Sequence, residues 1–483
     1  MDSFKLKTVY IFCAITCTLN MGCRKLIAID PPLDTVTTVE VFSTDALATS
    51  AMAGVYTLMA NGNGNFPQPT SGFSMGLTTI LGGLSSDELF LSSGNSGNQM
   101  YLYNTNRISA LNSGASTTLW TSAYKIIYGS NSVIEGIAAS TAPALHNNVR
   151  TELTAQAKFV RAFCYFYLTN FFGDVPMVLT VDFNKTRNLR RMPQQEVYQQ
   201  IIKDLIDAQA ALPPDYSAGQ GERVIPNKWA ATLLLARAYL YIGDYINAAA
   251  QATAVISHTA LFGLETDLNR VFLIDSREAV WQLKQTNESS AVKNATTEGY
   301  GFNLPSPYSL TNQLLSGFDA EDQRKLAWVG SSVISGSTRN YPHKYKIGSK
   351  NGEAYQPPLE YYMILRLAEA YLIRAEATAN GALGGIATAI SDLNIIRNRA
   401  DLDDLNEDLS QQQVIAAVAK EKQIEFFSEW GHRWFDLKRT GKAGAVLSAI
   451  PLKQPWPGNY QLLYPIPVAE IIIDPFLTQN PDY

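Results

Sequence analysis

The densest group of charged and aromatic side chains is the segment EKQIEFFSEWGHRWFDLKR at residues 421–439. Carboxylates and guanidinium groups among large aromatic rings can form an active site, or they can form an ion-pair network that locks a helix end into the core. Glu421 and Glu425 lie one helical turn apart, and no nucleophile or water-activating group accompanies them. We therefore favour the structural interpretation, in which arginines pair with these carboxylates.

Two further motifs match catalytic patterns in part. Residues 72–76 (GFSMG) match the GxSxG nucleophile motif around Ser74, which requires a strand before the serine and a helix after it. This copy lies in a loop rich in Asn, Gly and Pro, so a chance match explains it better. Asp87 and Glu88 form an acid pair, but adjacent side chains point apart and cannot face one substrate atom together. We expect no catalytic residues and no enzyme activity.

The residue types also argue against several other classes of function. The four histidines are each isolated from cysteine or a second histidine, so no zinc-binding spacing is present. No glycine-rich phosphate-binding motif occurs. A net charge of −5, from 38 Lys and Arg against 43 Asp and Glu, argues against nucleic-acid binding. We expect no metal, no cofactor and no nucleic-acid partner.

The N-terminus has the features of a secretory signal. Lys5 and Lys7 precede an apolar run at residues 9–19, and Cys23 follows directly after a glycine. The run is too short to span a bilayer, which takes about twenty residues. The ending resembles a bacterial lipobox, so we predict a signal peptide at residues 1–22 and lipid attachment at Cys23. Since no later stretch of the sequence is long and apolar enough to span a membrane, this lipid would be the only membrane anchor.

The elements that position these groups are mostly helices. Capping residues and apolar periodicity predict a helix that Ser43 or Thr44 caps and that ends at Ala60. The same signals predict further helices over residues 119–137, 152–172, 194–212, 228–242, 244–257, 360–380, 385–400 and 411–428. We therefore expect a mostly α architecture, in which long polar loops separate the helices and are the places where function is usually located.

Three of these helices share a short pattern. The pattern reads Arg-Ala-Phe at residues 161–163, Arg-Ala-Tyr-Leu at 237–240 and Glu-Ala-Tyr-Leu at 369–372. Small alanines let two antiparallel helices approach, and an aromatic ring fills the gap between pairs, as in tetratricopeptide-type hairpins. The spacing between the copies is irregular, so the sequence predicts a degenerate and interrupted array.

Many ordered blocks of the chain resemble the SusD/RagB lipoproteins of Bacteroidota. The blocks in the first half are CRKLIAIDPP, VFSTDALATSAMAGVY, SSDELF, LWTSAYKIIYGSNSVIEGI, AKFVRAFCYFYLTNFFGDVPMVL, EVYQQIIKDLIDAQAALP and AATLLLARAYLYIGDY. Those in the second half are FDAEDQR, YYMILRLAEAYLIRAEA, LNIIRNRA, EFFSEWGHRWFDLKRTG and YPIPVAEIIIDPFLTQNPDY. Together they cover nearly all of the chain after the signal.

This resemblance implies a noncatalytic outer-membrane lipoprotein that faces the cell exterior. Its fold would be mostly α, with tetratricopeptide-like hairpins, long interrupting loops and few short strands. It would act as the lid of a SusC-like TonB-dependent transporter and capture an oligosaccharide or, in some members, a peptide. The chain would divide into an N-terminal SusD-like region at residues 23–225 and a C-terminal RagB/SusD region at 226–483, packed as one globular unit.

Binding physics suggests which loops could hold a glycan. Sugars present apolar C–H faces and hydroxyl rims, so a site needs flat aromatic rings beside amide or carboxylate groups. The loops with this mixture contribute six candidate ligand-binding residues, namely Tyr101, Tyr103, Asn104, Tyr300, Phe302 and Trp328. For each aromatic ring, packing of its own loop onto the helices is the competing explanation.

Three other functions stay open at this stage. A peptide-binding member of the same family would share every feature above. A secreted α-helical glycoside hydrolase needs two carboxylates about 5 to 9.5 Å apart across a cleft, and no such pair is recognisable in the sequence. A pure protein–protein scaffold is the third possibility, because tetratricopeptide-like arrays often bind peptides in a concave groove.

Overall fold

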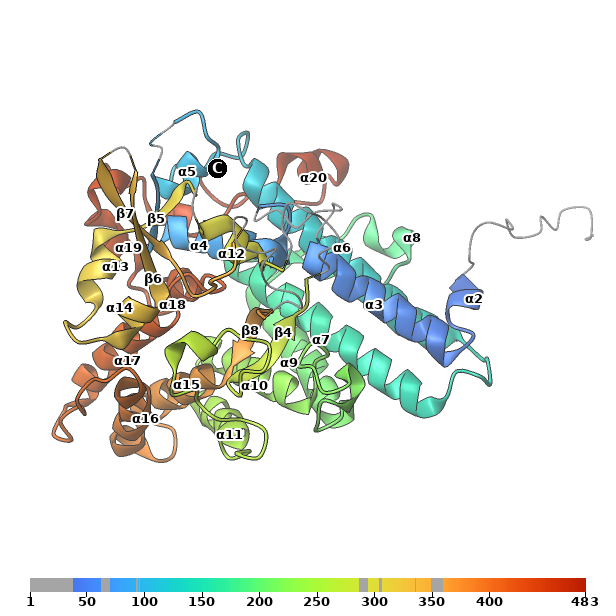
Figure 1. Cartoon of the computed structure of the whole chain (residues 1–483). Coiled ribbons are helices and arrows are strands. Elements are labelled where there is room, and N and C mark those ends of the chain that lie inside the picture. Colours follow the sequence, from blue (N-terminus) through green and yellow to red (C-terminus); the bar gives the residue numbers. More distant parts are fainter. Residues whose placement is uncertain are drawn as a thin grey trace, which may run out of the picture.

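The computed structural model describes residues 38–61, 70–92, 94, 96–285, 294–303, 306–334, 336–348 and 359–483. The predicted signal peptide and Cys23 lie outside these residues. The chain is mostly helical, as predicted (Figure 1). The longer helices of the described part are α3 (Asp45–Asn61), α4 (Thr78–Ser85), α6 (Gly114–Ala139), α7 (Asn147–Phe172), α9 (Gln194–Ala211), α10 (Lys228–Tyr241), α11 (Tyr245–Ile256), α15 (Leu367–Ala379), α16 (Gly385–Arg399), α17 (Gln411–Glu425) and α18 (His432–Arg439).

The remaining elements are short. The short helical segments are α2 (Thr38–Val41), η2 (Phe73–Leu77), α5 (Met100–Asn104), α8 (Phe183–Thr186), η3 (Ser217–Gly219), η4 (Leu268–Arg270), α12 (Thr297–Phe302), α13 (Asn312–Gly317), α14 (Gln323–Trp328), α19 (Ala443–Ser448), η6 (Pro451–Lys453), η7 (Asn459–Leu462) and α20 (Val468–Ile473). The strands form antiparallel pairs, β1 (Leu89–Leu91) with β5 (Tyr308–Leu310), β2 (Val175–Pro176) with β3 (Arg191–Met192), β4 (Ala279–Leu283) with β8 (Tyr362–Arg366) and β6 (Val329–Ile334) with β7 (Ser337–Pro342).

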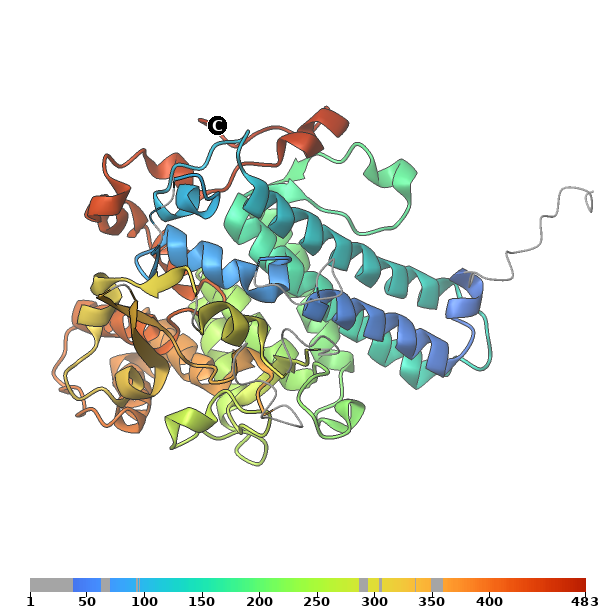
Figure 2. The same cartoon turned by 45° about the horizontal axis from the view of Figure 1, so that its top comes forward.

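The long helices form an interrupted array. Each of α6, α7, α9, α10, α11, α15, α16 and α17 contacts the next in this series. Helix α11 packs directly on α15, although residues 257–366 lie between them in the sequence. Figures 1 and 2 both show α3 running alongside α6 and α7 at the other end of the array. The predicted array of helical hairpins is therefore present, and a long insertion interrupts it. No described helix is long and apolar enough to cross a bilayer.

The repeated Arg/Glu-Ala pattern explains how neighbouring helices fit. Ala162, Ala238 and Ala370 are completely buried, which allows the close approach that small residues permit. The charged residues of the second and third copies pair with each other. Arg237 forms a bidentate ion pair with Glu369, with N–O distances of 2.5 and 2.7 Å. The pattern thus supplies both the close packing and the ion pair that join α10 to α15.

The helices predicted from residues 119 and 152 begin five residues earlier, at Gly114 and Asn147, and a third predicted start falls on a strand. The helix predicted from residue 360 begins only at Leu367, and the preceding residues form strand β8. All five β8 residues are buried, and the strand, an apolar run that ends on Arg366, pairs with β4. A short buried strand and the first turns of a buried helix have the same apolar appearance in sequence, and the pairing with a distant strand decides between them.

Candidate ligand-binding site

The dense charged segment of the sequence contributes to a buried group of ion pairs, which we call the ionic cluster. It consists of Glu278, Arg324, Lys344, Arg366, Arg399, Glu421, Glu425 and Glu429. Arg366 contacts Glu425 at 2.5 Å and Glu429 at 2.9 Å. Arg324 contacts Glu421 at 2.5 Å and Glu425 at 3.0 Å.

The electrostatics of the ionic cluster identify it as structural. Desolvation alone would raise the pKa of Glu425, but Arg399, Arg366 and Arg324 hold that pKa well below its usual range. Glu425 is completely buried, and three guanidinium groups occupy its carboxylate oxygens. A carboxylate held in this way is neither accessible to substrate nor available as a base. The structural interpretation of this segment is therefore confirmed.

The other two catalytic-looking motifs are also engaged in the fold. The Ser74 hydroxyl donates to the Met59 carbonyl at 2.7 Å, and Ser74 is only 2% exposed. Arg433 forms a bidentate ion pair with Asp87, with N–O distances of 2.7 and 2.8 Å. Burial, with the nearby Asp87 charge, raises the pKa of Glu88 to about 8. None of these side chains has the exposure that a nucleophile or catalytic acid needs.

Four of the six predicted ligand-binding residues are buried. Tyr103 and Trp328 have no exposed surface, Asn104 is 2% exposed and Phe302 is 3% exposed. The Tyr103 hydroxyl accepts a hydrogen bond from the Ser116 amide at 2.8 Å, and the Trp328 indole donates to the Leu268 carbonyl at 3.0 Å. In this conformation the four side chains pack their own segments and cannot contact a ligand.

Tyr101 and Tyr300 are the two predicted residues that keep exposed surface. Tyr101 lies on α5, and the C-terminal segment supports the loop that follows this helix. There Arg107 donates to the Pro455 carbonyl at 2.8 Å, and the Ile108 amide donates to Gln461 at 2.8 Å. The role of Tyr101 and Tyr300 in ligand binding stays a prediction.

Tyr300 belongs to a larger polar and aromatic surface, which we call the α12–β7 face. Its members are Tyr300, Asn303, Tyr341 and His343, all of them partly exposed. Tyr300 and Asn303 are three residues apart on and just after α12, so they lie on one side of that helix. Tyr341 and His343 alternate along β7 and its extension, so they also share a side, with ring centroids 5.6 Å apart.

Hydrogen bonds join the two halves of the α12–β7 face. The Asn303 amide nitrogen donates to the Gly299 carbonyl at 2.8 Å and to the Tyr345 carbonyl at 3.1 Å. Its amide oxygen lies 2.8 Å from Nδ1 of His343. Burial, with the nearby Lys346 charge, lowers the pKa of His343 to about 4, so this imidazole is neutral at pH 7.

Glycine makes room for the exposed ring of Tyr341. Gly330 on β6 lies opposite Tyr341 on β7. A Cβ atom at Gly330 would lie only 2.4 Å from the Tyr341 ring, so the ring rests across the backbone of the neighbouring strand. The result is a flat aromatic surface next to a neutral imidazole, which is the combination that carbohydrate C–H faces and hydroxyl groups require.

The α12–β7 face is anchored from behind by the ionic cluster. Lys344 follows His343 directly and points the opposite way, into the core. Its ammonium group donates to Glu429 at 2.5 Å and to the Glu425 carbonyl at 2.8 Å. A rigid scaffold of this kind holds binding groups in place before the ligand arrives.

Sequence reasoning named Tyr300 on this face and missed Tyr341 and His343. The signal available for the missed pair is the alternation in STRNYPHK at residues 337–344, which places every second side chain on one side of a strand. Asn303 lies in the loop that the sequence singled out, but its partner His343 is forty residues away and becomes visible only through the fold.

Comparisons with known proteins identify the family. Residues 55–240 match the family described as "Starch-binding associating with outer membrane", and residues 327–483 match the SusD family. The chain belongs to the SusD/RagB family. This is a glycan-binding family associated with the outer membrane, as the resemblance in sequence predicted.

Named relatives of this SusD-family chain come from several bacteria. SusD-like protein P2 of Formosa agariphila is 27% identical over an alignment of 420 residues that covers 77% of this chain and 81% of the relative. The starch-binding protein SusD of Bacteroides thetaiotaomicron is 24% identical over 423 residues, covering 68% and 72% of the two chains.

Solved structures share the fold. A SusD superfamily protein from Bacteroides vulgatus superposes with a TM-score of 0.75 at 20% identity, covering 92% of this chain and all of that chain. A laminarin-binding SusD-like protein superposes with a TM-score of 0.72 at 22% identity, covering the same shares. The predicted fold class is therefore confirmed.

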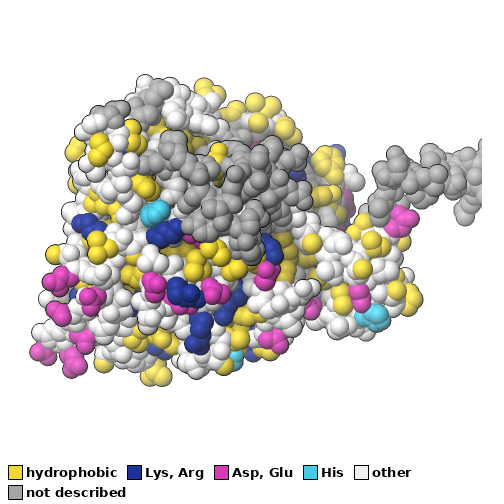
Figure 3. Space-filling view, viewed as in Figure 1, with side chains coloured by type: hydrophobic (Ala, Val, Ile, Leu, Met, Phe, Trp, Pro, Cys, Tyr) yellow, Lys and Arg dark blue, Asp and Glu magenta, His cyan; other side chains and the backbone are white. Residues whose placement is uncertain are grey.

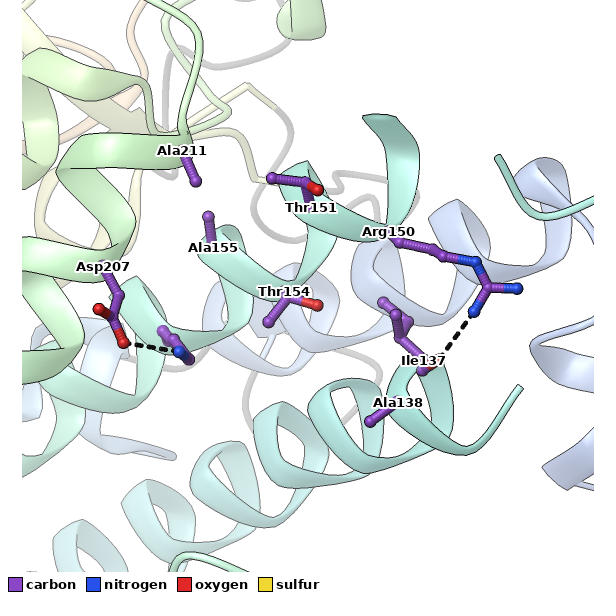
Figure 4. Close-up of a pocket in the computed structure, with 9 residues that line it drawn as sticks. Ile137, Ala138, Arg150, Thr151, Thr154, Ala155, Asp207 and Ala211 are labelled. Carbon is purple, nitrogen blue, oxygen red and sulfur yellow. Dashed lines mark hydrogen bonds and ion pairs between the residues drawn. The ribbon is translucent and has the colours of Figure 1, made fainter. Parts of the chain in front are cut away.

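Among the pockets that the described residues form, two of the larger ones lack aromatic side chains in their lining. One of about 480 Å³ lies between α6, α7 and α9 (Figure 4). There Arg150 donates to carbonyl groups including that of Ile137, and Lys158 pairs with Asp207 at 2.7 Å. Another of about 750 Å³ runs along α16 and the loop that follows. Acidic side chains gather at the lower left of Figure 3, where Figure 1 places α16 and α17.

A third pocket has aromatic lining together with polar side chains, among them Asn188 and Glu470. Its volume is about 610 Å³, and it lies between α6, α8 and α20. Trp120 in its lining is 3% exposed, and the Tyr124 hydroxyl is already bonded to the Pro176 carbonyl at 2.8 Å. Phe183 is 69% exposed on a helix of four residues. The exposed ring of Phe183 makes this pocket an alternative glycan site, against which the α12–β7 face can be tested.

Proposed function

We propose that this chain is a nutrient-binding lipoprotein of the outer-membrane surface that captures a glycan on the α12–β7 face. The glycan would pass to a SusC-like TonB-dependent transporter, with this protein as its lid. Attachment through a lipid on Cys23 would hold it at the membrane, facing the cell exterior. The α12–β7 face carries the proposal, because it combines exposed tyrosine rings with a hydrogen-bonding pair of fixed geometry.

The names of relatives support a neutral sugar as the first ligand to test. One relative is described as starch-binding and one structural neighbour as laminarin-binding. Both polysaccharides are uncharged glucans. The α12–β7 face fits such a ligand, because His343 is neutral at pH 7 and the tyrosines offer apolar surface.

A glycan panel tests the binding step. The purified chain is titrated by calorimetry with maltoheptaose and with laminarin oligosaccharides, and then with a pool of peptides. We expect saturable binding of a glycan and no release of reducing sugar from it. Saturable binding of peptides alone would favour the peptide-binding alternative, and hydrolysis of the glycan would favour the glycoside hydrolase.

The transporter and the anchor need separate tests. Expressed in a Bacteroidota host together with a SusC-like TonB-dependent transporter, the chain is expected to co-purify with that β-barrel. Mass spectrometry of the mature protein is expected to find an acylated N-terminus at Cys23, and Cys23→Ala is expected to release the protein from the membrane fraction. An unacylated N-terminus, or a mature chain that starts elsewhere, would contradict the predicted anchor.

A further inference from the structure

The hydrogen bonds around Asn303 determine which nitrogen of His343 carries a proton. The Asn303 amide nitrogen faces two backbone carbonyls, those of Gly299 at 2.8 Å and Tyr345 at 3.1 Å. Carbonyl oxygens only accept hydrogen bonds, so the amide NH2 group must point toward them. If the amide were flipped, its oxygen would face both carbonyl oxygens with no hydrogen between them.

The amide oxygen of Asn303 is therefore the atom that faces His343. It lies 2.8 Å from Nδ1 and can only accept, so Nδ1 must carry the hydrogen. A neutral imidazole carries a single N–H, which leaves Nε2 with an exposed lone pair. Nε2 has no hydrogen-bond partner among the described residues and is not one of the enclosed polar atoms.

We propose that Nε2 of His343 is a fixed hydrogen-bond acceptor for a ligand hydroxyl, positioned by Asn303, and that it selects ligands that donate a hydrogen bond at this point. This inference rests on the proposed function, because it assigns the polarity of one contact within the same face. A sugar hydroxyl is such a donor, whereas an ionised carboxylate can only accept.

The neighbouring residues support this geometry. The Tyr341 ring stands at 74° to the imidazole, which limits its rotation on one side. The His343 amide donates to the Trp328 carbonyl at 2.8 Å, and Lys344 is pinned in the ionic cluster. Both the ring and its backbone are thus held, so the lone pair has a defined direction.

The first test needs no ligand. Nitrogen-15 spectra of the histidine-labelled full chain distinguish a ring protonated at Nδ1 from one protonated at Nε2. His343→Gln identifies the signal, since only four histidines are present. We expect the Nδ1–H form at pH 7. A signal for the Nε2–H form would overturn the inference, whatever the protein binds.

The second test measures binding of maltoheptaose and laminarin oligosaccharides by calorimetry. His343→Phe keeps a flat ring but removes the acceptor, and we expect about threefold to tenfold weaker binding, as for one neutral hydrogen bond. His343→Gln retains an acceptor oxygen and should recover part of this loss. The matched control is His258→Phe, because His258 is also half-buried but stacks on Trp229 with ring centroids 4.4 Å apart.

The outcomes separate the two proposals. If wild type and His343→Phe bind the glycan equally well, the inference fails and the proposed function stands. If the wild-type chain binds no glycan at all, the proposed function fails, and the inference about its ligand fails with it. Weaker binding by His343→Phe, recovery by His343→Gln and no change in His258→Phe would together support the inference.

Discussion

The ionic cluster and the α12–β7 face use polar side chains in opposite ways. In the ionic cluster, charged groups from distant segments are buried and bonded to one another, as in the contact of Arg324 with Glu421. On the α12–β7 face, uncharged groups are partly exposed, and His343 keeps one nitrogen without a partner among the described residues. A high density of charged residues thus marks the frame of this molecule, and a few incompletely bonded groups mark its proposed binding surface.

The two regions meet along one short segment. Tyr341 and His343 point outward, whereas Lys344, the residue after His343, points into the ionic cluster. The backbone that presents the imidazole is thus fixed by an ammonium group on its other side. We therefore expect substitutions in the ionic cluster to lower stability, and substitutions on the α12–β7 face to lower ligand affinity.

The largest effect is expected from breaking the ionic cluster. Arg366→Met leaves the buried carboxylates of Glu425 and Glu429 without one of their main partners, which should cost about 3–5 kcal/mol of the free energy of unfolding. Urea denaturation measures the loss. Lys185→Met is the control, because Lys185 is 73% exposed and pairs with Asp182 at 3.5 Å. Its loss should stay below about 0.5 kcal/mol. Equal losses of unfolding free energy in Arg366→Met and Lys185→Met would contradict the stabilising role of the buried ionic cluster.

The inner side of α12 should show a distinct pH dependence. Burial raises the pKa of Glu298 to about 8, although Thr79 and Tyr362 donate hydrogen bonds to it. The folded state therefore keeps a proton that the unfolded chain loses near pH 4.5. Stability should fall as pH rises from about 4.5 to 8, by at most about 1.4 kcal/mol per pH unit. Glu298→Gln cannot ionise and should flatten this slope in thermal unfolding measured across that range. An unchanged slope would mean that Glu298 is ionised in the folded protein.

A smaller effect, on affinity alone, is expected from the binding surface. Tyr300→Ala removes a partly exposed ring and should weaken glycan binding about tenfold, a loss of about 1.4 kcal/mol, without changing the urea midpoint. Phe183→Ala is the control, because Phe183 is an exposed ring in the aromatic-lined pocket beside α8. Calorimetry should find its affinity unchanged. A loss in Phe183→Ala but not in Tyr300→Ala would move the site to the pocket beside α8.

The smallest effect is expected at the serine of the GxSxG motif. Ser74→Ala loses the hydrogen bond to the Met59 carbonyl and should cost about 1 kcal/mol of stability. Glycan affinity should not change, because the hydroxyl is buried. Thermal unfolding and calorimetry on the same preparation check both statements. An effect on affinity as large as that of Tyr300→Ala would contradict the structural role of this serine.

Much of the frame could be predicted from sequence, because local patterns encode it. Periodicity and capping placed helices such as Gln194–Ala211 and Lys228–Tyr241 within one residue of their observed ends. The pairing of arginines with the carboxylates near Glu425 followed from composition alone. Which arginine pairs with which carboxylate could not be predicted, since Arg324 and Glu421 are ninety-seven residues apart in the sequence.

The binding surface was harder to predict, because exposure depends on distant contacts. Tyr103 and Tyr300 both lie in segments that the sequence predicts as polar loops and that form the short helices α5 and α12, yet only Tyr300 keeps accessible surface. Tyr103 is buried against Tyr464 from the C-terminal segment, with ring centroids 5.3 Å apart. No local feature of either loop shows which of them a distant segment will cover. His343 was missed for the same reason, since its significance depends on Asn303 from another element.

A crystal structure of the full mature chain with a bound oligosaccharide from the glycan panel would show where the ligand lies. We expect a sugar ring against Tyr300, with one hydroxyl within hydrogen-bond distance of Nε2 of His343, and no rearrangement of the ionic cluster. A sugar bound in the pocket beside α8, with the α12–β7 face empty, would contradict this expectation.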